Sequence, residues 1–300
     1  MAMYKHKLIN GWPLFLLVSL PISALIVTEL LATDLSTGDG VSHMIGYAVR
    51  FAVPLIFLVV AAPAVQILFP GPLPNWLLRN RKYVGLSFAV AMAWQGLFIF
   101  VMSYFYREYY YEEVYYFRDE LEGSVGYLFL LAMATTSFHF GRKYTTPSQW
   151  KLLHRSAMYF LWAYPFSTYW WSTAYYYGIP GTTDYVFYWM GFLAVAARIA
   201  AWGKQRLKAA SADILGNSIP LGFRLVSGAL IGLGLVAAAT GAQWRVAVSD
   251  FLTAPAWSGN LELWLPFWPF EPFLPLLIIG FGTLLATKVH LSQARAAATA

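Results

Sequence analysis

The chain has 300 residues, of which 59% are hydrophobic and only 11% are charged, whereas an ordinary soluble domain has roughly 25% charged residues. A soluble enzyme is therefore excluded, because too few charges remain to cover its surface. The sequence has no cysteine, which excludes disulfides, thiolate metal sites and iron–sulfur clusters. The net charge of +6 does not predict nucleic-acid binding, since the basic residues lie in short loops between apolar segments.

Apolar runs of the length that crosses a bilayer recur along the chain. About 20 apolar residues in a helix span a hydrocarbon core of about 30 Å. Eight segments have this pattern, and they are residues 11–32, 45–69, 83–106, 125–142, 151–177, 183–202, 222–242 and 269–288. The sequence therefore predicts an all-α, polytopic membrane helix bundle with about eight transmembrane helices.

The placement of charges predicts how these helices are oriented. With the N-terminus in the cytoplasm, the inner side holds all of the 20 Lys and Arg residues except Arg50, Arg107, Arg118 and Arg245, and every acidic residue except Asp213 falls on the outer side. This distribution satisfies the positive-inside rule. We expect a multi-pass protein of the cell inner (plasma) membrane with both termini cytoplasmic.

Three segments, two in outer loops and one within a predicted span, allow either a functional or a structural interpretation. The outer run 107–122 reads REYYYEEVYYFRDELE, which fits a surface that attracts cations or a partner, or an interfacial aromatic belt. The outer stretch 257–273, rich in Trp and Pro, suggests re-entry into the interface. The run 228–232, GALIG, has the spacing of small residues that lets membrane helices approach closely, against a partner or within the bundle.

Few ionisable residues lie inside the predicted spans, and each is a candidate for function. Glu29 and Arg50 lie at similar depth near the outer ends of the first two spans, which predicts either an intramembrane ion pair or separate snorkelling to the interface. His139 and His154 lie about one turn from the inner ends of the fourth and fifth spans. Helices joined by a short loop are usually neighbours, so these imidazoles either share a haem iron or a metal ion, or hydrogen-bond separately at the membrane boundary.

Several segments together resemble the ferric-reductase-like transmembrane domain, the six-helix module of ferric reductases, NADPH oxidases and the haem subunit of the bacterial methionine sulfoxide reductase system. These segments are RNRKYVGLSFA at 79–89, ATTS at 134–137 and WKLLHR at 150–155, followed by Tyr159. The resemblance implies a ferric-reductase-like six-helix core over residues 1–208 and a two-helix membrane extension over residues 209–300. It also implies transmembrane electron transfer through b-type haem held by histidines on the third and fifth helices.

Of the haem-ligand pattern that the resemblance implies, His154 is present, whereas Gln95 and Ser167 stand at two further ligand positions. Two interpretations follow. In one, the protein is a redox subunit with a single b-type haem on His154, with His139 as second ligand; in the other, the haem site is lost and the protein is a non-catalytic accessory subunit. No flavin or NAD domain is expected, because no phosphate-binding glycine motif is present. The expected partners are membrane lipids, a membrane or periplasmic protein, and quinone, with no nucleic acid.

Overall fold

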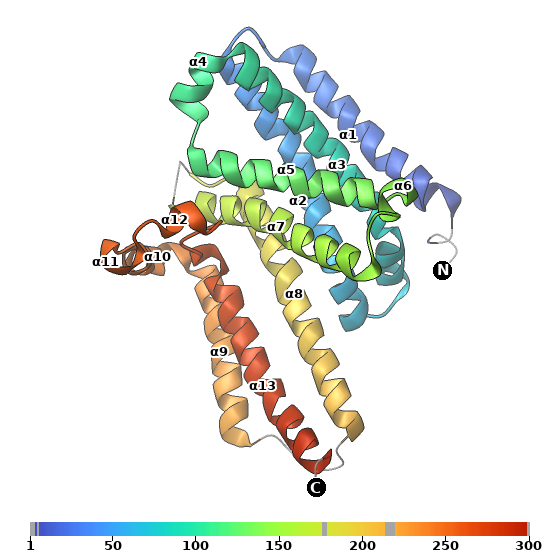
Figure 1. The fold of residues 1–300 in the computed structure, drawn as a ribbon, viewed down its shortest axis with the longest axis vertical. Coiled ribbons are helices and arrows are strands. Elements are labelled where there is room, and N and C mark those ends of the chain that lie inside the picture. Colours follow the sequence, from blue (N-terminus) through green and yellow to red (C-terminus); the bar gives the residue numbers. More distant parts are fainter. Residues whose placement is uncertain (1–3, 5, 176–178, 214–219, 299–300) are drawn as a thin grey trace. The chain divides into compact units, whose positions relative to one another are not determined.

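The computed structural model describes residues 4, 6–175, 179–213 and 220–298, and their side chains apart from those of 209–213, 262–263 and 288–298. All regular secondary structure within these ranges is helical (Figure 1). The predicted all-α class is therefore confirmed for this part of the chain. Residues 176 and 177, which end the predicted 151–177 span, lie outside the described residues, as do the terminal residues 299 and 300.

Five helices are long and apolar enough to cross a membrane. They are α1 (Trp12–Ala32), α2 (Gly38–Leu68), α3 (Pro72–Phe105), α8 (Thr182–Asp213, of which Thr182–Lys208 is the apolar part) and α9 (Leu221–Ala239). The other long helices are α5 (Phe117–Thr136), α7 (Pro147–Tyr175), α10 (Gly241–Leu252) and α13 (Leu274–Ala298). Each of the five apolar helices covers one predicted span, which supports a membrane protein, while the full count of eight spans stays a prediction.

Short helical segments connect the long helices. They are η2 (Lys7–Ile9), α4 (Arg107–Tyr109), the π-helical turn η3 (Tyr110–Val114), α6 (His139–Arg142), α11 (Pro255–Ser258), α12 (Leu261–Trp264) and η4 (Glu271–Phe273). The predicted span 125–142 is thus not one helix, since α5 ends at Thr136 and α6 is separate. The hydroxyls of Thr136 and Ser137 donate to the carbonyls of Ala132 and Met133, at 2.6 and 2.7 Å. Hydroxyls that bond the preceding turn in this way compete with the helical backbone bonds.

The chain forms two compact units, while the division into residues 1–208 and 209–300 that the resemblance implies stays a prediction. Unit 1 comprises residues 1–62 and 71–165, and unit 2 comprises residues 63–70 and 166–300. In unit 1, the core of α1, α2 and α3 includes Leu14, Val59 and Val84. The hydroxyl of Ser19 on α1 also donates to that of Ser87 on α3, at 3.0 Å in a buried position, so α1 and α3 are joined by a polar contact as well as by apolar packing.

In unit 2, α13 packs against both α8 and α9. α9 and α13 lie close together at Gly234, where a Cβ atom would stand 2.7 Å from the carbonyl oxygen of Pro275. Only glycine fits there without moving the backbone. By contrast, a Cβ at Gly228 or Gly232 would meet no atom within 4 Å. Among the described residues, the two glycines of the GALIG run therefore do not lie at a helix–helix contact.

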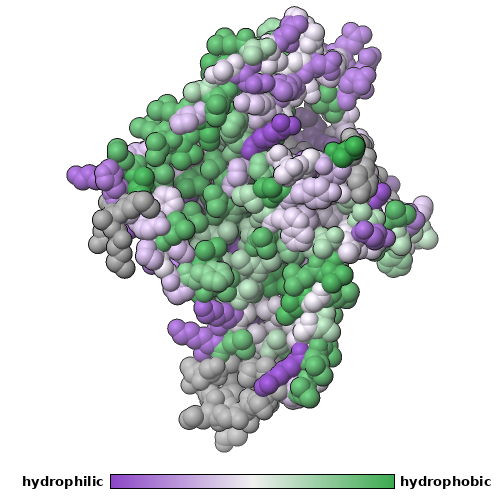
Figure 2. Space-filling view, turned by 180° about the vertical axis from the view of Figure 1, so that it is seen from behind, coloured by the Kyte–Doolittle hydropathy of each residue, from purple (hydrophilic) through white to green (hydrophobic). Residues whose placement is uncertain are grey.

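Large apolar side chains are exposed along the apolar helices. On α1 they include Leu16, Leu17, Leu20, Leu25 and Leu31, and on α9 they include Leu225, Val226, Leu233, Leu235 and Val236. Hydrophobic residues accordingly cover much of the face drawn in Figure 2. Contiguous apolar surface of this kind is typical of contact with membrane or with protein.

Candidate functional site

The two membrane histidines lie in different surroundings. His154, on α7, is partly buried; its Nε2 lies 2.9 Å from the Thr136 hydroxyl, and its ring lies 4.2 Å from that of Trp150. His139 lies at the start of the separate helix α6 and is exposed. Among the described side chains, no group of three or more His, Asp or Glu residues is arranged to hold a metal ion.

Glu29 has a different partner from the predicted Arg50. Its Oε1 lies 2.8 Å from Nε2 of His43, on the first turns of α2. Arg50 lies seven residues further along α2, which corresponds to about 10 Å of helical rise, and its side chain is exposed. The sequence pattern placed both residues near the outer boundary but did not resolve which side chain of α2 stands opposite Glu29.

A cavity of about 660 Å³ lies within unit 1, among α2, α3, η3, α5 and the first part of α7. Its volume falls in the range of roughly 300–1,000 Å³ that is usual for small-molecule sites. Much of its lining is apolar and includes Ile45, Val49, Val53, Ile56, Phe88 and Ile99. Gly123 on α5 also lines it, and a Cβ there would meet no atom within 4 Å. The missing side chain of Gly123 therefore leaves space beside α5.

One polar pair stands in the wall of this cavity. Gln95 on α3 and Tyr127 on α5 both line it, and the Tyr127 hydroxyl lies 3.2 Å from Gln95 Oε1 and 3.1 Å from the Met92 carbonyl oxygen. The Tyr127 ring packs at 3.2 Å from where a Cβ of Gly96 would stand. The contact engages the amide oxygen of Gln95 as acceptor, which leaves its NH2 group as a donor at the cavity wall.

Three carboxylates line the cavity near the start of α5, and they differ in their partners. Glu122 is buried and accepts from Nε of Arg118 at 3.1 Å. Glu120 Oε2 accepts from the Tyr110 hydroxyl at 2.5 Å. Asp119 has neither a hydrogen bond nor an ion pair within the described residues. Desolvation raises the pKa of Asp119, the charge of Glu122 raises it further, and Arg118 opposes both.

The tyrosines around these carboxylates come from other elements. Tyr110 on η3, Tyr116 before α5 and Tyr164 on α7 all line the cavity. Burial and the hydrogen bond to Glu120 raise the pKa of Tyr110, so this hydroxyl stays a donor. The segment 107–122 thus contributes one wall of the cavity, and Tyr116, Asp119 and Glu120 are exposed there. The sequence signal that could have indicated this cavity is a cluster of acidic residues followed by the small residues Gly123, Ser124 and Gly126.

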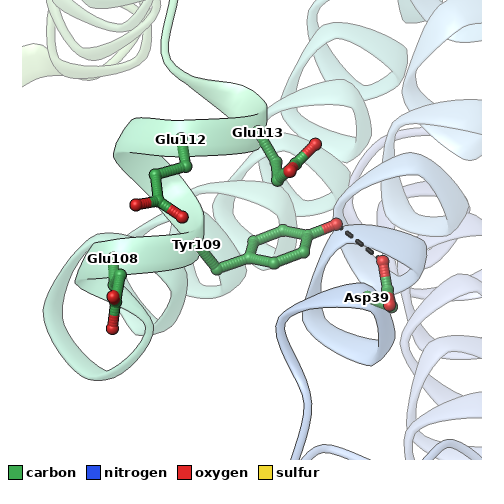
Figure 3. A pocket seen from close by; sticks show the side chains of 5 residues that line it. All are labelled: Asp39, Glu108, Tyr109, Glu112 and Glu113. Atoms are coloured by element: carbon green, nitrogen blue, oxygen red, sulfur yellow. Dashed lines mark hydrogen bonds between the residues drawn. The ribbon is translucent and has the colours of Figure 1, made fainter.

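The outer part of the same segment forms an open acidic pocket. Its lining residues are Asp39, Glu108, Tyr109, Glu112 and Glu113 (Figure 3). The Tyr109 hydroxyl donates to Asp39 Oδ1 at 2.7 Å, and this bond raises the pKa of Tyr109. A Cβ at Gly38 would stand only 2.4 Å from the Tyr109 ring, so the glycine at the start of α2 lets this ring lie over the helix.

Unit 2 contains a buried polar cluster that sequence reasoning missed. Glu271 is 0% exposed; its Oε2 lies 3.5 Å from the Tyr175 hydroxyl, and its Oε1 has no hydrogen-bond partner among the described atoms. The same hydroxyl lies 3.0 Å from Ser249 Oγ, and the Arg245 guanidinium lies 3.6 Å from the Tyr175 ring centre. Phe270, next to Glu271, has a left-handed φ of 66°, which costs of order 1–3 kcal/mol for such a residue. The only sequence signal was a lone acidic residue within an apolar stretch.

The residues present do not fit a haem held by two histidines. The Nε2 of His154 is engaged by Thr136, His139 lies exposed on another helix, and no histidine lines the unit 1 cavity. Gln95, at one of the implied ligand positions, lines that cavity instead. Ser167, at the other, is buried in the part of α7 that belongs to unit 2.

Comparison of the chain with protein-family models, with curated proteins and with solved structures finds no match. The resemblance to the ferric-reductase-like domain stays a prediction from the quoted residues.

Proposed function

We propose that this chain is a multi-pass protein of the inner membrane, with both termini cytoplasmic, which binds an amphipathic molecule of the membrane in the unit 1 cavity. In this proposal it is a haem-free relative of ferric-reductase-like electron-transfer subunits and serves as an accessory subunit of a membrane complex. The candidate ligands are lipid and quinone, both of which carry an apolar tail and a polar head. The positive-inside charge distribution supports the orientation.

The observation that carries the proposal is the cavity itself. It combines about 660 Å³ of mostly apolar space with the Gln95–Tyr127 pair on one wall and carboxylates near the start of α5. Small-molecule sites are typically apolar clefts with a few polar groups that fix the orientation of the ligand. An apolar tail would replace empty space by dispersion contacts, and the Gln95 amide would hydrogen-bond a polar atom.

Photolabelling in lipid nanodiscs tests this proposal. The full-length protein is exposed to dodecyl probes that carry a diazirine on the tail and four different heads: trimethylammonium, sulfate, maltoside and benzoquinone. We expect at least one probe to label α2, α3 or α5 residues of the cavity, as located by peptide mass spectrometry. Gly123→Trp should reduce this labelling about tenfold or more, because the indole would occupy the space where a Cβ of Gly123 meets no atom.

The matched control is Gly228→Trp, which adds the same side chain at an exposed position of α9 where a Cβ also meets no atom within 4 Å. This variant should label like the unmodified protein. If none of the four probes labels the cavity, or if both variants lower labelling equally, the proposed function is wrong.

A reduced-minus-oxidised spectrum tests the haem-bearing alternative, in which His154 and His139 ligate one b-type haem. After expression with ample haem supply, we expect no b-type α-band. A band that His154→Ala abolishes and Gln95→Ala leaves intact would overturn the haem-free proposal.

A further inference from the structure

The polar end of the unit 1 cavity carries an excess of negative charge. Asp119, Glu120 and Glu122 line the cavity within little more than one turn of α5. Arg118 pairs with Glu122, whereas Asp119 and Glu120, which are exposed, have no ion pair among the described residues. Glu120 is held by a neutral tyrosine hydroxyl, and Asp119 has no hydrogen bond or ion pair within the described residues.

Three tyrosine side chains line the same cavity as these carboxylates. Tyr110, Tyr116 and Tyr164 line the same cavity, and the ring faces of tyrosine attract ammonium groups. Carboxylates together with aromatic faces are the combination that recognises amines and quaternary ammonium ions. The same surroundings repel phosphate, sulfate and carboxylate heads, because like charges in a partly desolvated site disfavour binding.

The apolar part of the cavity supplies the complementary feature. Ile56 and Phe88, both lining residues, are themselves buried, and so are Ala52 and Val53. These residues offer an environment for a hydrocarbon chain, while the carboxylates offer an environment for a positive head. Charge and polarity thus divide the cavity into two parts that match the two parts of a cationic amphiphile.

Resting on the function proposed above, we propose that the ligand of the unit 1 cavity is a cationic amphiphile, a single hydrocarbon chain with an amine or quaternary ammonium head. Its chain lies against α2 and α3, and its head lies at the carboxylates of α5 and the tyrosines around them. The Gln95–Tyr127 pair lies in the wall of the same cavity.

The four dodecyl probes with matched tails test this inference. We expect the trimethylammonium probe to label the cavity best, and the sulfate probe about tenfold or more less efficiently at equal membrane concentration. In Asp119→Asn/Glu120→Gln, labelling by the trimethylammonium probe should fall about tenfold, while labelling by the maltoside probe stays within about twofold.

The matched control is Glu112→Gln/Glu113→Gln, which removes the same charge from the open acidic pocket of the neighbouring turn. This variant should retain the preference for the trimethylammonium probe. Thermal unfolding of both double variants checks that the fold is kept, since carboxylates in the first turn also stabilise a helix N-terminus.

The possible outcomes separate this inference from the proposed function. Equal labelling by the cationic and sulfate probes, or preferred labelling by the benzoquinone probe, would overturn the cationic head while leaving a ligand-binding cavity. An equal loss in both double variants would mean that a general surface potential attracts the cation, which also overturns the inference. If no probe labels the cavity, the proposed function itself fails.

Discussion

Replacement of Glu271 by methionine should stabilise the protein. The carboxyl of Glu271 is 0% exposed, and one of its oxygens has no partner among the described atoms; an unsatisfied buried polar group costs about 1–3 kcal/mol. The interactions that would be lost are the contact from the Tyr175 hydroxyl to Oε2, which at 3.5 Å is weak, a hydrogen bond with Ser249 and the attraction of Arg245. Arg245 would keep its cation–π contact with the Tyr175 ring. Tyr175 keeps its 3.0 Å bond to Ser249. Methionine has a similar length and flexibility, so Glu271→Met should gain about 1–2 kcal/mol.

Thermal unfolding in detergent, followed by tryptophan fluorescence, measures this effect. A gain of about 1–2 kcal/mol corresponds to an increase of about 2–8 °C in Tm for a unit of this size. Glu271→Ala should instead lower Tm, since it leaves a cavity that costs about 2–4 kcal/mol. Glu108→Met, at an exposed acidic residue, should change stability by less than about 0.5 kcal/mol. A loss of more than about 1 kcal/mol in Glu271→Met would refute the reasoning, because the carboxyl would then contribute favourable interactions.

Three further outcomes follow from particular contacts. Asn80→Ala should cost about 2–4 kcal/mol, because the 1% exposed amide bonds the N-terminal segment and its own helix at 2.9–3.0 Å; thermal unfolding against the exposed control Asn75→Ala measures it. Labelling by the trimethylammonium probe should fall on acidification, and the loss should begin at a higher pH than an ordinary aspartate would give. The reason is that protonation removes the attracting charge and the pKa of Asp119 is raised; a titration unchanged by Asp119→Asn would contradict this. Gly234→Leu should destabilise the protein by about 1–3 kcal/mol relative to Gly228→Leu, because only at Gly234 would a Cβ meet an α13 carbonyl, at 2.7 Å.

Hydropathy located the apolar helices well and their ends poorly. The span predicted to begin at residue 83 belongs to a helix that begins at Pro72, and the span predicted to begin at residue 45 belongs to one that begins at Gly38. Hydropathy detects the apolar run, whereas a helix continues through polar residues as long as its backbone hydrogen bonds are made. Helix α3 begins with Pro72, a residue that is favoured in the first turn of a helix. Residues 72–82, which mix apolar and polar side chains, then extend α3 beyond its apolar part.

The candidate site was harder to predict than the fold, because it depends on which side chains meet across helices. Gln95 was singled out from the sequence as a replaced ligand position, and it lines the cavity. Its contact with Tyr127, 32 residues away, has no signature in spacing or composition. The same limit applies to Glu271, whose contacts with Tyr175 and Ser249 join segments far apart in the chain.

The Gln95–Tyr127 pair bears on whether the cavity is a site or a packing defect. Two apolar residues would fill this wall without the cost of placing an amide and a hydroxyl in apolar surroundings, which is about 1–3 kcal/mol for each unsatisfied group. The Tyr127 hydroxyl lies within donating distance of both the Gln95 amide oxygen and the Met92 carbonyl oxygen, and the Gln95 NH2 group is a further donor at the cavity wall. A packing defect gains nothing from an amide in an otherwise largely apolar wall, whereas a ligand with an acceptor oxygen beside Gln95 would accept a hydrogen bond from its NH2 group. Gln95→Leu should therefore weaken labelling by the maltoside and benzoquinone probes, whose heads carry acceptor oxygens, more than labelling by the trimethylammonium probe, while raising stability; a merely structural role for Gln95 would not produce this combination.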